Sequence, residues 1–295
     1  MVRREEIEPS TWDTLAPMSE ADEVLNRWTN SAAYWEKHRE TIRRMFGPVS
    51  EALIEDAEVA AGNIVLDVAT GFGEPALRVA EVVGVAGEVV GVDPVAGMID
   101  TATGAAARLS LENARFEVAG VDNLPFPDDR FDAVVSRFGV MFFPSPLNGI
   151  REMLRVLKPG RRMALAVWHF FDNNPFHHTL ARIVDRYAPE PALPPDARDP
   201  FRFAPPGKLK EIMIEAEVHE VTERLFRFPI NVSLSVEEFW NLRLEISEKL
   251  RQRLATLAPD TLSDLKRQAL DAFHTHSTAA GLSFPAEVLI VSGGK

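Results

Sequence analysis

The sequence contains no cysteine among its 295 residues. This absence excludes a structural disulfide, a thiolate-bound metal and a cysteine nucleophile. Positive charge is also scarce, because 32 lysine and arginine residues face 44 acidic ones, a formal net charge of −12. A surface with this balance repels phosphate backbones and anionic lipid, so neither nucleic acid nor a membrane surface is expected as a partner.

Long apolar runs are missing from the beginning of the chain. Residues 1–30 contain no continuous apolar stretch, so they predict neither a signal peptide nor a membrane-spanning helix. Together with the cysteine-free composition, this favours a cytoplasmic protein. Apolar residues make up 46% of the whole chain, which predicts a globular fold.

Residues 61–168 alternate between short apolar runs and helical patterns. Strands are predicted at residues 64–68, 88–92, 114–118, 131–136 and 162–168, and helices at residues 75–83, 95–109 and 147–157. Short apolar strands separated by helices predict a parallel sheet covered on both faces. Right-handed crossovers then give an open, doubly wound α/β sheet.

The remaining chain predicts additions to this sheet. Residues 188–207 contain too much proline for regular structure. Further helices are expected at residues 176–187, 208–216, 236–257 and 262–273, with strands at 218–232 and 286–292. The simplest architecture is a mostly parallel, seven-stranded domain of residues 61–234 and 284–295. Residues 235–283 would form a helical cap between its last two strands, and residues 1–60 a loose arm (1–20) and lid helices.

The first predicted strand ends in a glycine-rich turn. Residues 71–76 (GFGEPA) match the G-x-G-x-x-A pattern of a dinucleotide-binding turn, and Asp93 lies twenty residues beyond Gly73. Ligands of open α/β sheets bind outside the carboxyl ends of the strands. Glycine allows a tight turn and close backbone approach, and Pro75 suits the first position of a helix. The pattern alone is compatible with a nicotinamide cofactor, with another adenosine-bearing molecule, or with no ligand.

Three acidic residues favour a ligand without phosphates. Glu74 stands at the expected helix N-terminus, where a pyrophosphate would otherwise rest. Asp67 ends the preceding strand, and Asp122 follows the third strand. Several carboxylates around one crevice suit a cationic ligand better than a polyanion. S-adenosylmethionine has a sulfonium, an ammonium, a carboxylate and no phosphate, so the charges point to it.

The motifs, in this order, resemble those of class I S-adenosylmethionine-dependent methyltransferases. The matching segments are 67–73 (DVATGFG), 89–94 (VVGVDP) with Met98, 122–126 (DNLPF), 131–136 (FDAVVS) and 154–162 (LRVLKPGRR). Residues 284–291 (FPAEVLIV) are similar to the last strand of the ubiquinone/menaquinone-biosynthesis type of small-molecule methyltransferase. The resemblance implies a Rossmann-like methyltransferase fold with S-adenosyl-L-methionine as the cofactor.

The resemblance also implies which residues contact the methionine part of the cofactor. The backbone of Ala69, Gly71 and Gly73, in the turn that also contains Thr70, would approach it. Asp67 would serve the ammonium end, directly or by shaping the turn. A purely turn-capping role for Asp67 is the alternative.

The adenosine contacts are implied in the same way. Asp93 would accept hydrogen bonds from both ribose hydroxyls, with Pro94 and Met98 against the adenine. Asp122 would face the adenine amino group, and Asn123 would flank the ring. Asp93 and Asp122 could instead be ordinary loop residues.

Three further positions complete the implied cofactor site. Val121 belongs to the segment that carries the adenine contacts. Ser136 and Arg137 end the fourth strand beside the sulfonium. The family often has another residue where Arg137 stands, so Arg137 could bind either the cofactor carboxylate or a substrate anion.

Two residues are candidates for catalysis. His169 follows the fifth strand at the edge of the expected crevice and could act as a general base. Tyr34 and Trp35 lie in a helix that could close over the cofactor, adding a hydroxyl and an aromatic wall. A loop histidine without a catalytic role, and core packing of the two aromatic residues, are the alternatives. No metal is expected, because the pairs at 177–178 and 274–276 lack helical i, i+4 spacing and a third ligand.

Aromatic residues near the expected mouth favour a small, largely apolar or aromatic acceptor. They are Trp12, Trp28, Phe142, Phe143, Phe170, Phe176 and Trp240. The acceptor atom, carbon, oxygen or nitrogen, stays open. A non-catalytic, cofactor-binding partner protein is a second hypothesis. A nicotinamide-dependent reductase is disfavoured, since a Tyr-x-x-x-Lys pair is absent.

Overall fold

The computed structural model describes residues 20–194 and 196–295. The loose arm expected at residues 1–20 lies outside this range except for its last residue. Within the described ranges, none of the helices combines the length and apolar character needed to cross a bilayer.

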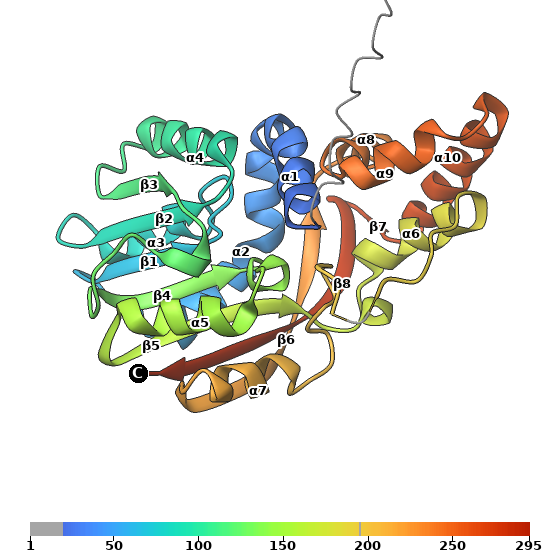
Figure 1. The fold of residues 1–295 in the computed structure, drawn as a ribbon. Helices are drawn as coiled ribbons and strands as arrows, with labels where there is room; N and C mark the ends of the chain where they lie inside the picture. The colour runs from blue at the N-terminus through green and yellow to red at the C-terminus, as the bar shows by residue number, and fades with distance from the viewer. Residues whose placement is uncertain (1–19, 195) are drawn as a thin grey trace, which may run out of the picture.

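In the described residues, seven strands of one eight-stranded sheet lie side by side, which confirms the expected doubly wound, mostly parallel architecture (Figure 1). Their order is β3-β2-β1-β4-β5-β8-β6. The strands are β1 (Ile64–Val68), β2 (Glu88–Asp93), β3 (Ala114–Val118), β4 (Phe131–Arg137), β5 (Leu157–Trp168), β6 (His219–Val232) and β8 (Gly281–Gly294). Strands β1 to β5 run parallel, whereas β8 runs antiparallel to β5 and β6. A two-residue strand, β7 (Ser277–Thr278), pairs with β8.

The helices follow the predicted segments closely. They are α1 (Glu20–Lys37), α2 (Arg39–Asp56), α3 (Ala76–Val83), α4 (Ala96–Leu109), α5 (Pro146–Val156), α6 (Pro175–Tyr187), α7 (Lys208–Glu215), α8 (Val236–Glu245), α9 (Glu248–Ala255) and α10 (Pro259–His274). Short 3₁₀ turns, η1 (Val121–Asn123), η2 (Val140–Phe142) and η3 (Phe171–Asn173), follow β3, β4 and β5. Residues 188–194 and 196–207 contain neither helix nor strand, as the prolines predicted.

Several predicted boundaries differ from the structure, since β5 begins at Leu157 instead of residue 162 and β8 spans Gly281–Gly294 instead of residues 286–292. Two helix boundaries differ as well. The single helix expected over residues 236–257 is two helices, because Ser247 caps a new helix by accepting a hydrogen bond from the Leu250 N–H at 3.3 Å. The helix expected to begin at Pro75 begins at Ala76, and Pro75 is its N-cap after a cis peptide bond. Neither difference moves the glycine-rich turn away from the end of β1.

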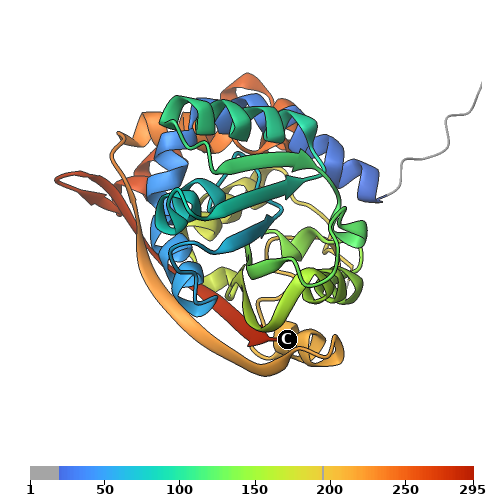
Figure 2. The ribbon, with the colours of Figure 1, turned by 90° about the vertical axis from the view of Figure 1, so that its left-hand side faces the viewer.

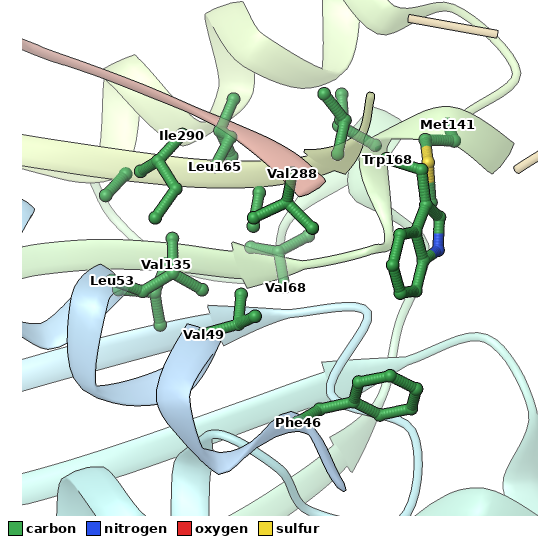
Figure 3. Packing of buried hydrophobic residues seen from close by; sticks show 14 of the residues in the cluster. Phe46, Val49, Leu53, Val68, Val135, Met141, Leu165, Trp168, Val288 and Ile290 are labelled. Atoms are coloured by element: carbon green, nitrogen blue, oxygen red, sulfur yellow. The ribbon is translucent and has the colours of Figure 1, made fainter. Parts of the chain in front are cut away.

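The core lies between the sheet and helices on both of its faces. Helices α2 and α3 pack on one face and α5 on the other (Figure 2). All seven residues of β4 are buried, as is typical of a parallel strand covered on both sides. Val49 and Leu53 of α2 point at Val68 and Val135, at the centre of the sheet (Figure 3).

Helix α1 connects the sheet domain with the helices that follow β6. It lies between α4 on one side and α8 and α9 on the other (Figure 1). Arg108 of α4 forms an ion pair with Glu36 at 2.8 Å, and Lys37 pairs with Glu245 of α8 at 2.7 Å. Helices α8, α9 and α10 all fall between β6 and β8 in the chain.

Candidate functional site

A cavity of about 350 Å³ opens at the carboxyl ends of β1, β2 and β4. Parallel pairing sets Val68 of β1 beside Val92 of β2. The turn that follows Val68 and Asp93, which follows Val92, therefore lie at the same edge of the sheet. The predicted cofactor residues that line this cavity are Ala69, Thr70, Gly71, Asp93, Pro94, Met98, Val121, Asp122 and Arg137. In the described structure Asp67, Gly73, Asn123 and Ser136 are not among its lining residues.

Asp67 holds the glycine-rich turn from beneath. Its Oδ2 accepts hydrogen bonds from the Thr70 hydroxyl at 2.6 Å and the Ala76 N–H at 3.1 Å. The side chain is fully buried, and this burial raises the pKa of Asp67 to about 7. The Oδ1 atom has no hydrogen-bond partner. Asp67 thus contacts the turn directly, and it influences the cavity only by holding the turn in place.

The turn depends on glycine at position 73. Gly73 has a φ of +100°, and a Cβ there would come within 3.2 Å of Ala102 and 3.1 Å of Leu77. A larger residue would push α3 away from α4. Gly71 also has a positive φ, +55°, so the backbone turns sharply in front of the cavity.

Asp93 joins the two loops that border the cavity. One carboxylate oxygen accepts from the Gly71 N–H at 3.0 Å and the other from the Val95 N–H at 2.9 Å. Burial raises the pKa of Asp93 to about 6 despite these hydrogen bonds. Each oxygen retains a second lone-pair direction for a hydroxyl donor, so the side chain can position the turn and still bind a ligand.

The segment after β3 also borders the cavity. Val121 is buried and Asp122 is exposed, and both line the cavity. Asn123 is exposed and lies outside the lining. The first two predicted residues of this segment therefore reach the cavity and the third does not.

Ser136 and Arg137 separate at the end of β4. The Ser136 hydroxyl donates to the Val68 carbonyl at 2.7 Å and so ties β4 to β1. Arg137 lines the cavity, although only 8% of its surface is exposed. Its Nη1 donates to the Ser50 hydroxyl at 2.8 Å and the Phe46 carbonyl at 3.4 Å. A buried guanidinium that lines the cavity is therefore held in place by α2.

Glu74 also lines the cavity. From the sequence, its carboxylate was expected only to exclude a phosphate. The residue is 4% exposed. Burial raises the pKa of Glu74, and the charge of Arg137 acts in the opposite direction. Its Oε1 has no hydrogen-bond partner.

Aromatic side chains of α1 and of the loops beside it form one wall of the cavity. Trp28 and Trp35 of α1 have ring centroids 5.6 Å apart. Trp35 stacks on Phe72 of the turn at 5.7 Å, and Trp28 meets Phe142 edge-on at 5.4 Å. The helix predicted to close over the cofactor is α1, and its Trp35 lines the cavity.

Only part of the predicted aromatic mouth is present. Phe143 lines the cavity together with Trp28 and Phe142. Phe170, Phe176 and Trp240 do not line it in the described structure, because Phe170 is 44% exposed and the other two are buried in the core. Trp12 lies outside the described residues.

The structure does not bring the two candidate catalytic residues to the cavity. The ring of Tyr34 faces Arg251 of α9, whose guanidinium carbon lies 4.6 Å from the ring centroid. His169 Nδ1 is hydrogen-bonded to the Glu287 carboxylate of β8 at 2.7 Å, and Asn173 lies at 3.3 Å from the same nitrogen. Neither residue is part of the cavity lining in the described chain.

The donors and acceptors of the cavity fit S-adenosylmethionine better than a dinucleotide. Glu74 occupies the position just before α3 that a pyrophosphate needs, and its carboxylate would repel phosphate. Its unpartnered oxygen can instead accept from a cation. Asp93 offers acceptors for ribose hydroxyls, and Pro94 and Met98 offer apolar surface beside it.

Fold and motifs together define a class I S-adenosylmethionine-dependent methyltransferase domain. The family model described as "Methyltransferase domain" matches residues 65–160, from β1 to the start of β5. This stretch contains the glycine-rich turn, Asp93 and Arg137.

Two curated relatives extend the comparison. An uncharacterized methyltransferase of Bacillus subtilis, YcgJ, is 32% identical over 54% of this chain and 55% of its own length. The ubiquinone/menaquinone biosynthesis C-methyltransferase UbiE of Ectopseudomonas mendocina is 38% identical over 46% of this chain and 52% of its own length. The chain thus spans about half the length of the curated relatives it matches.

A solved structure confirms the fold over a larger part of the chain. The crystal structure of YcgJ superposes with a TM-score of 0.54 at 22% identity, covering 83% of this chain and 97% of YcgJ. At this identity the likeness concerns the fold alone.

Proposed function

We propose that this protein transfers a methyl group from S-adenosylmethionine to a small, largely apolar or aromatic acceptor. The observation that carries the proposal is the composition of one cavity, in which acidic and apolar cofactor positions face an aromatic wall. The relationship to UbiE, a small-molecule C-methyltransferase by name, supports the acceptor class. It does not decide the acceptor atom.

The cofactor supplies an electrophilic methyl group on a sulfonium, so the protein must orient and shield the reactants. In our proposal Asp93 accepts hydrogen bonds from the ribose hydroxyls, and Asp122 does so from the adenine amino group. The backbone of Ala69 and Gly71 borders the methionine part, and Arg137 holds its carboxylate. Asp67 and Gly73 act indirectly by setting the turn.

Orientation is the main catalytic contribution that these residues can make. Holding two reactants in line can contribute about 7–11 kcal/mol to lowering a barrier. Trp28, Trp35 and Phe142 provide apolar surface for the methyl acceptor in the cavity. This surface excludes water and orients a planar or apolar substrate. A general base on the protein is needed only for an acceptor that arrives protonated.

Calorimetry tests the cofactor assignment first. S-adenosylmethionine and S-adenosylhomocysteine should both bind the purified protein with a 1:1 stoichiometry, and NADH should not. Binding of NADH without either adenosyl ligand would reverse the assignment. The variant Asp128→Asn serves as the control for Asp93→Asn, since its exposed carboxylate lies away from the cavity and pairs with Arg155.

A transfer assay tests the reaction. The protein should move label from methyl-labelled S-adenosylmethionine to a member of a panel of small aromatic and prenylated acceptors. Asp93→Asn should abolish most of this transfer, and Asp128→Asn should retain it. Tight cofactor binding with no transfer to any small acceptor, but capture of a protein partner, would favour the non-catalytic alternative.

A further inference from the structure

The loop of residues 196–207 is fastened to the rim of the cavity. Arg202 Nη1 donates a hydrogen bond to the Phe143 carbonyl at 3.0 Å, and Phe143 lines the cavity. At the start of the loop, Asp196 forms an ion pair with Lys208 of α7 at 2.6 Å. These contacts give the loop a defined position, although it contains neither helix nor strand.

This position brings Arg198 into the lining of the cavity. The other charged lining residues of the described chain lie at or just beyond the ends of β1 to β4, in or beside the cofactor motifs. They are Glu74, Asp93, Asp122 and Arg137. Arg198 thus adds to the described lining a charge that the cofactor motifs do not supply.

The contacts of the loop place Arg198 beside the aromatic residues of the cavity. The loop is bonded to the Phe143 carbonyl, and the preceding residue, Phe142, meets Trp28 of α1 edge-on at 5.4 Å. Asp199, the residue after Arg198, lies close enough to α1 to be affected by the charge of the arginine before Trp28. A molecule packed against these rings therefore lies next to a guanidinium.

The acidic residues around the loop do not reverse this charge. Asp199 does not line the cavity in the described structure. Burial raises the pKa of Asp199, and the positive charges of Lys249 and Arg27 oppose this shift more than the negative charge of Glu190 adds to it. Glu190 in turn forms an ion pair with Lys249 at 2.8 Å. The charge that the loop presents to the cavity is therefore that of the Arg198 guanidinium.

A guanidinium beside aromatic rings suits a carboxylate on an apolar molecule. Its planar fork can donate two parallel hydrogen bonds to one carboxylate. Arg198 is partly buried, and the lower dielectric constant beside apolar side chains strengthens such a pair relative to water. The net charge of −12 disfavours anions in general, so an anionic acceptor needs a local cation of this kind.

We propose that the methyl acceptor carries a carboxylate on its apolar or aromatic body, and that Arg198 binds this carboxylate. The proposal rests on the proposed function and narrows its acceptor class. It gives the loop of residues 196–207 a role in selecting the acceptor, separate from the residues that hold the cofactor.

Titrations with paired probes isolate this contact. Naphthoate and naphthamide share one shape, but only naphthoate is an anion at neutral pH. With the protein saturated with S-adenosylhomocysteine, we expect the parent to bind naphthoate about tenfold more tightly than naphthamide, the effect of one hydrogen bond to a charged group. Arg198→Gln should lose most of this preference. It should bind naphthamide and S-adenosylhomocysteine as the parent does, since neither depends on this charge.

Two further variants make the result decisive. Arg198→Lys keeps the charge without the planar fork, so it should retain part of the preference for naphthoate. It also serves in place of Arg198→Gln if that variant does not fold in a thermal melt. Arg182→Gln removes the same charge from the surface of α6, where Arg182 pairs with Asp172 at 2.7 Å away from the cavity lining, and should behave as the parent does.

The possible outcomes separate this proposal from the proposed function. An Arg198→Gln variant that keeps the parent's preference, or that loses affinity for both probes equally, would overturn the role of Arg198. A parent that binds S-adenosylhomocysteine but neither probe, or both probes alike, would overturn the carboxylate-bearing acceptor. A parent that does not bind S-adenosylhomocysteine would instead contradict the proposed function.

Discussion

At the residue scale, Asp93 performs two tasks with one carboxylate. It fixes the N–H groups of Gly71 and Val95, and it presents the same oxygens to the cavity. Both tasks need the ionised form, because a protonated carboxyl loses acceptor strength. With a pKa of about 6, Asp93 therefore loses its charge, and both tasks weaken, as pH falls from 7 to 5.

The first prediction concerns this carboxylate and pH. If the ligand binds only the ionised form of Asp93, affinity for S-adenosylhomocysteine should fall about tenfold from pH 8 to pH 5, following the pKa of about 6. Asp93→Asn should bind about 100-fold more weakly at pH 8, having lost charged acceptors, and should show less of this pH dependence. Calorimetric titrations at pH 8, 6.5 and 5 measure both effects. An affinity that does not change with pH would mean that Asp93 stays ionised or does not touch the ligand.

Asp67 gives a second prediction, this time on stability. Its pKa rises from 3.8 to about 7 in the folded protein, so the native state holds a proton that the unfolded state has lost between these values. The free energy of unfolding contributed by this group should therefore be greatest below pH 4 and fall by up to about 1.4 kcal/mol per pH unit as pH rises to 7.

The variant Asp67→Asn isolates that contribution from the other carboxylates. Asparagine cannot titrate, so the stability of the parent relative to the variant should decrease from pH 5 to pH 7. Urea unfolding of both proteins at matched pH values gives the difference directly. A difference that is constant with pH would contradict the raised pKa.

At the element scale, local patterns predicted strands and turns well but not which way side chains point. The turn after β1 could be predicted because its glycines and Asp67 act within one short segment. The break at Ser247 was missed although serine is a strong N-cap, since the apolar spacing runs through it. The orientations of Tyr34 and His169 depend on α9 and β8, which are distant in sequence. No local pattern contains that information.

His169 follows β5 directly and links this strand to β8 through hydrogen bonds. Its ring and backbone N–H both bond to Glu287, and Asn173 donates to the same carboxylate at 2.7 Å. We expect His169→Ala to lower the melting temperature by a few degrees, consistent with the loss of about 1–2 kcal/mol from a partly buried charged hydrogen bond. S-adenosylhomocysteine affinity should not change, because the residue does not line the cavity. A large loss of turnover with normal stability would restore the general-base hypothesis.

Helix α1 supplies the aromatic wall, and Trp35 lies over the turn against Phe72. A cation near the face of an indole gains about 0.5–2 kcal/mol. We therefore expect Trp35→Leu to weaken binding of the sulfonium ligand S-adenosylmethionine several-fold more than binding of the uncharged thioether S-adenosylhomocysteine. Competition titrations with the two ligands measure the ratio. An equal loss for both would assign Trp35 to shape alone.

At the scale of the whole molecule, the cavity depends on segments that are far apart in the chain. The sheet provides Asp93 and Arg137, the turn provides Glu74, and α1 provides Trp28 and Trp35. The sequence predicted the sheet and its ligand edge, since parallel strands share their carboxyl ends. It could not predict how α1 sits, because this helix contacts α4, α8 and α9, which are distant from it in the sequence.

This arrangement predicts where ligand binding will stabilise the protein. A ligand that binds only the folded state suppresses the local openings that would expose its site, and leaves independent regions unaffected. S-adenosylhomocysteine should therefore slow amide hydrogen exchange in residues 69–74, 93–98 and 119–122 and in α1. Exchange in α7 and in the part of β6 that pairs near the carboxyl end of β8 should not change, because these segments do not border the cavity. Mass-spectrometric exchange with and without ligand measures this pattern. Protection spread evenly over α7 and β6 would mean that the ligand acts on global stability only, and protection absent from α1 would mean that this helix does not close over the cofactor.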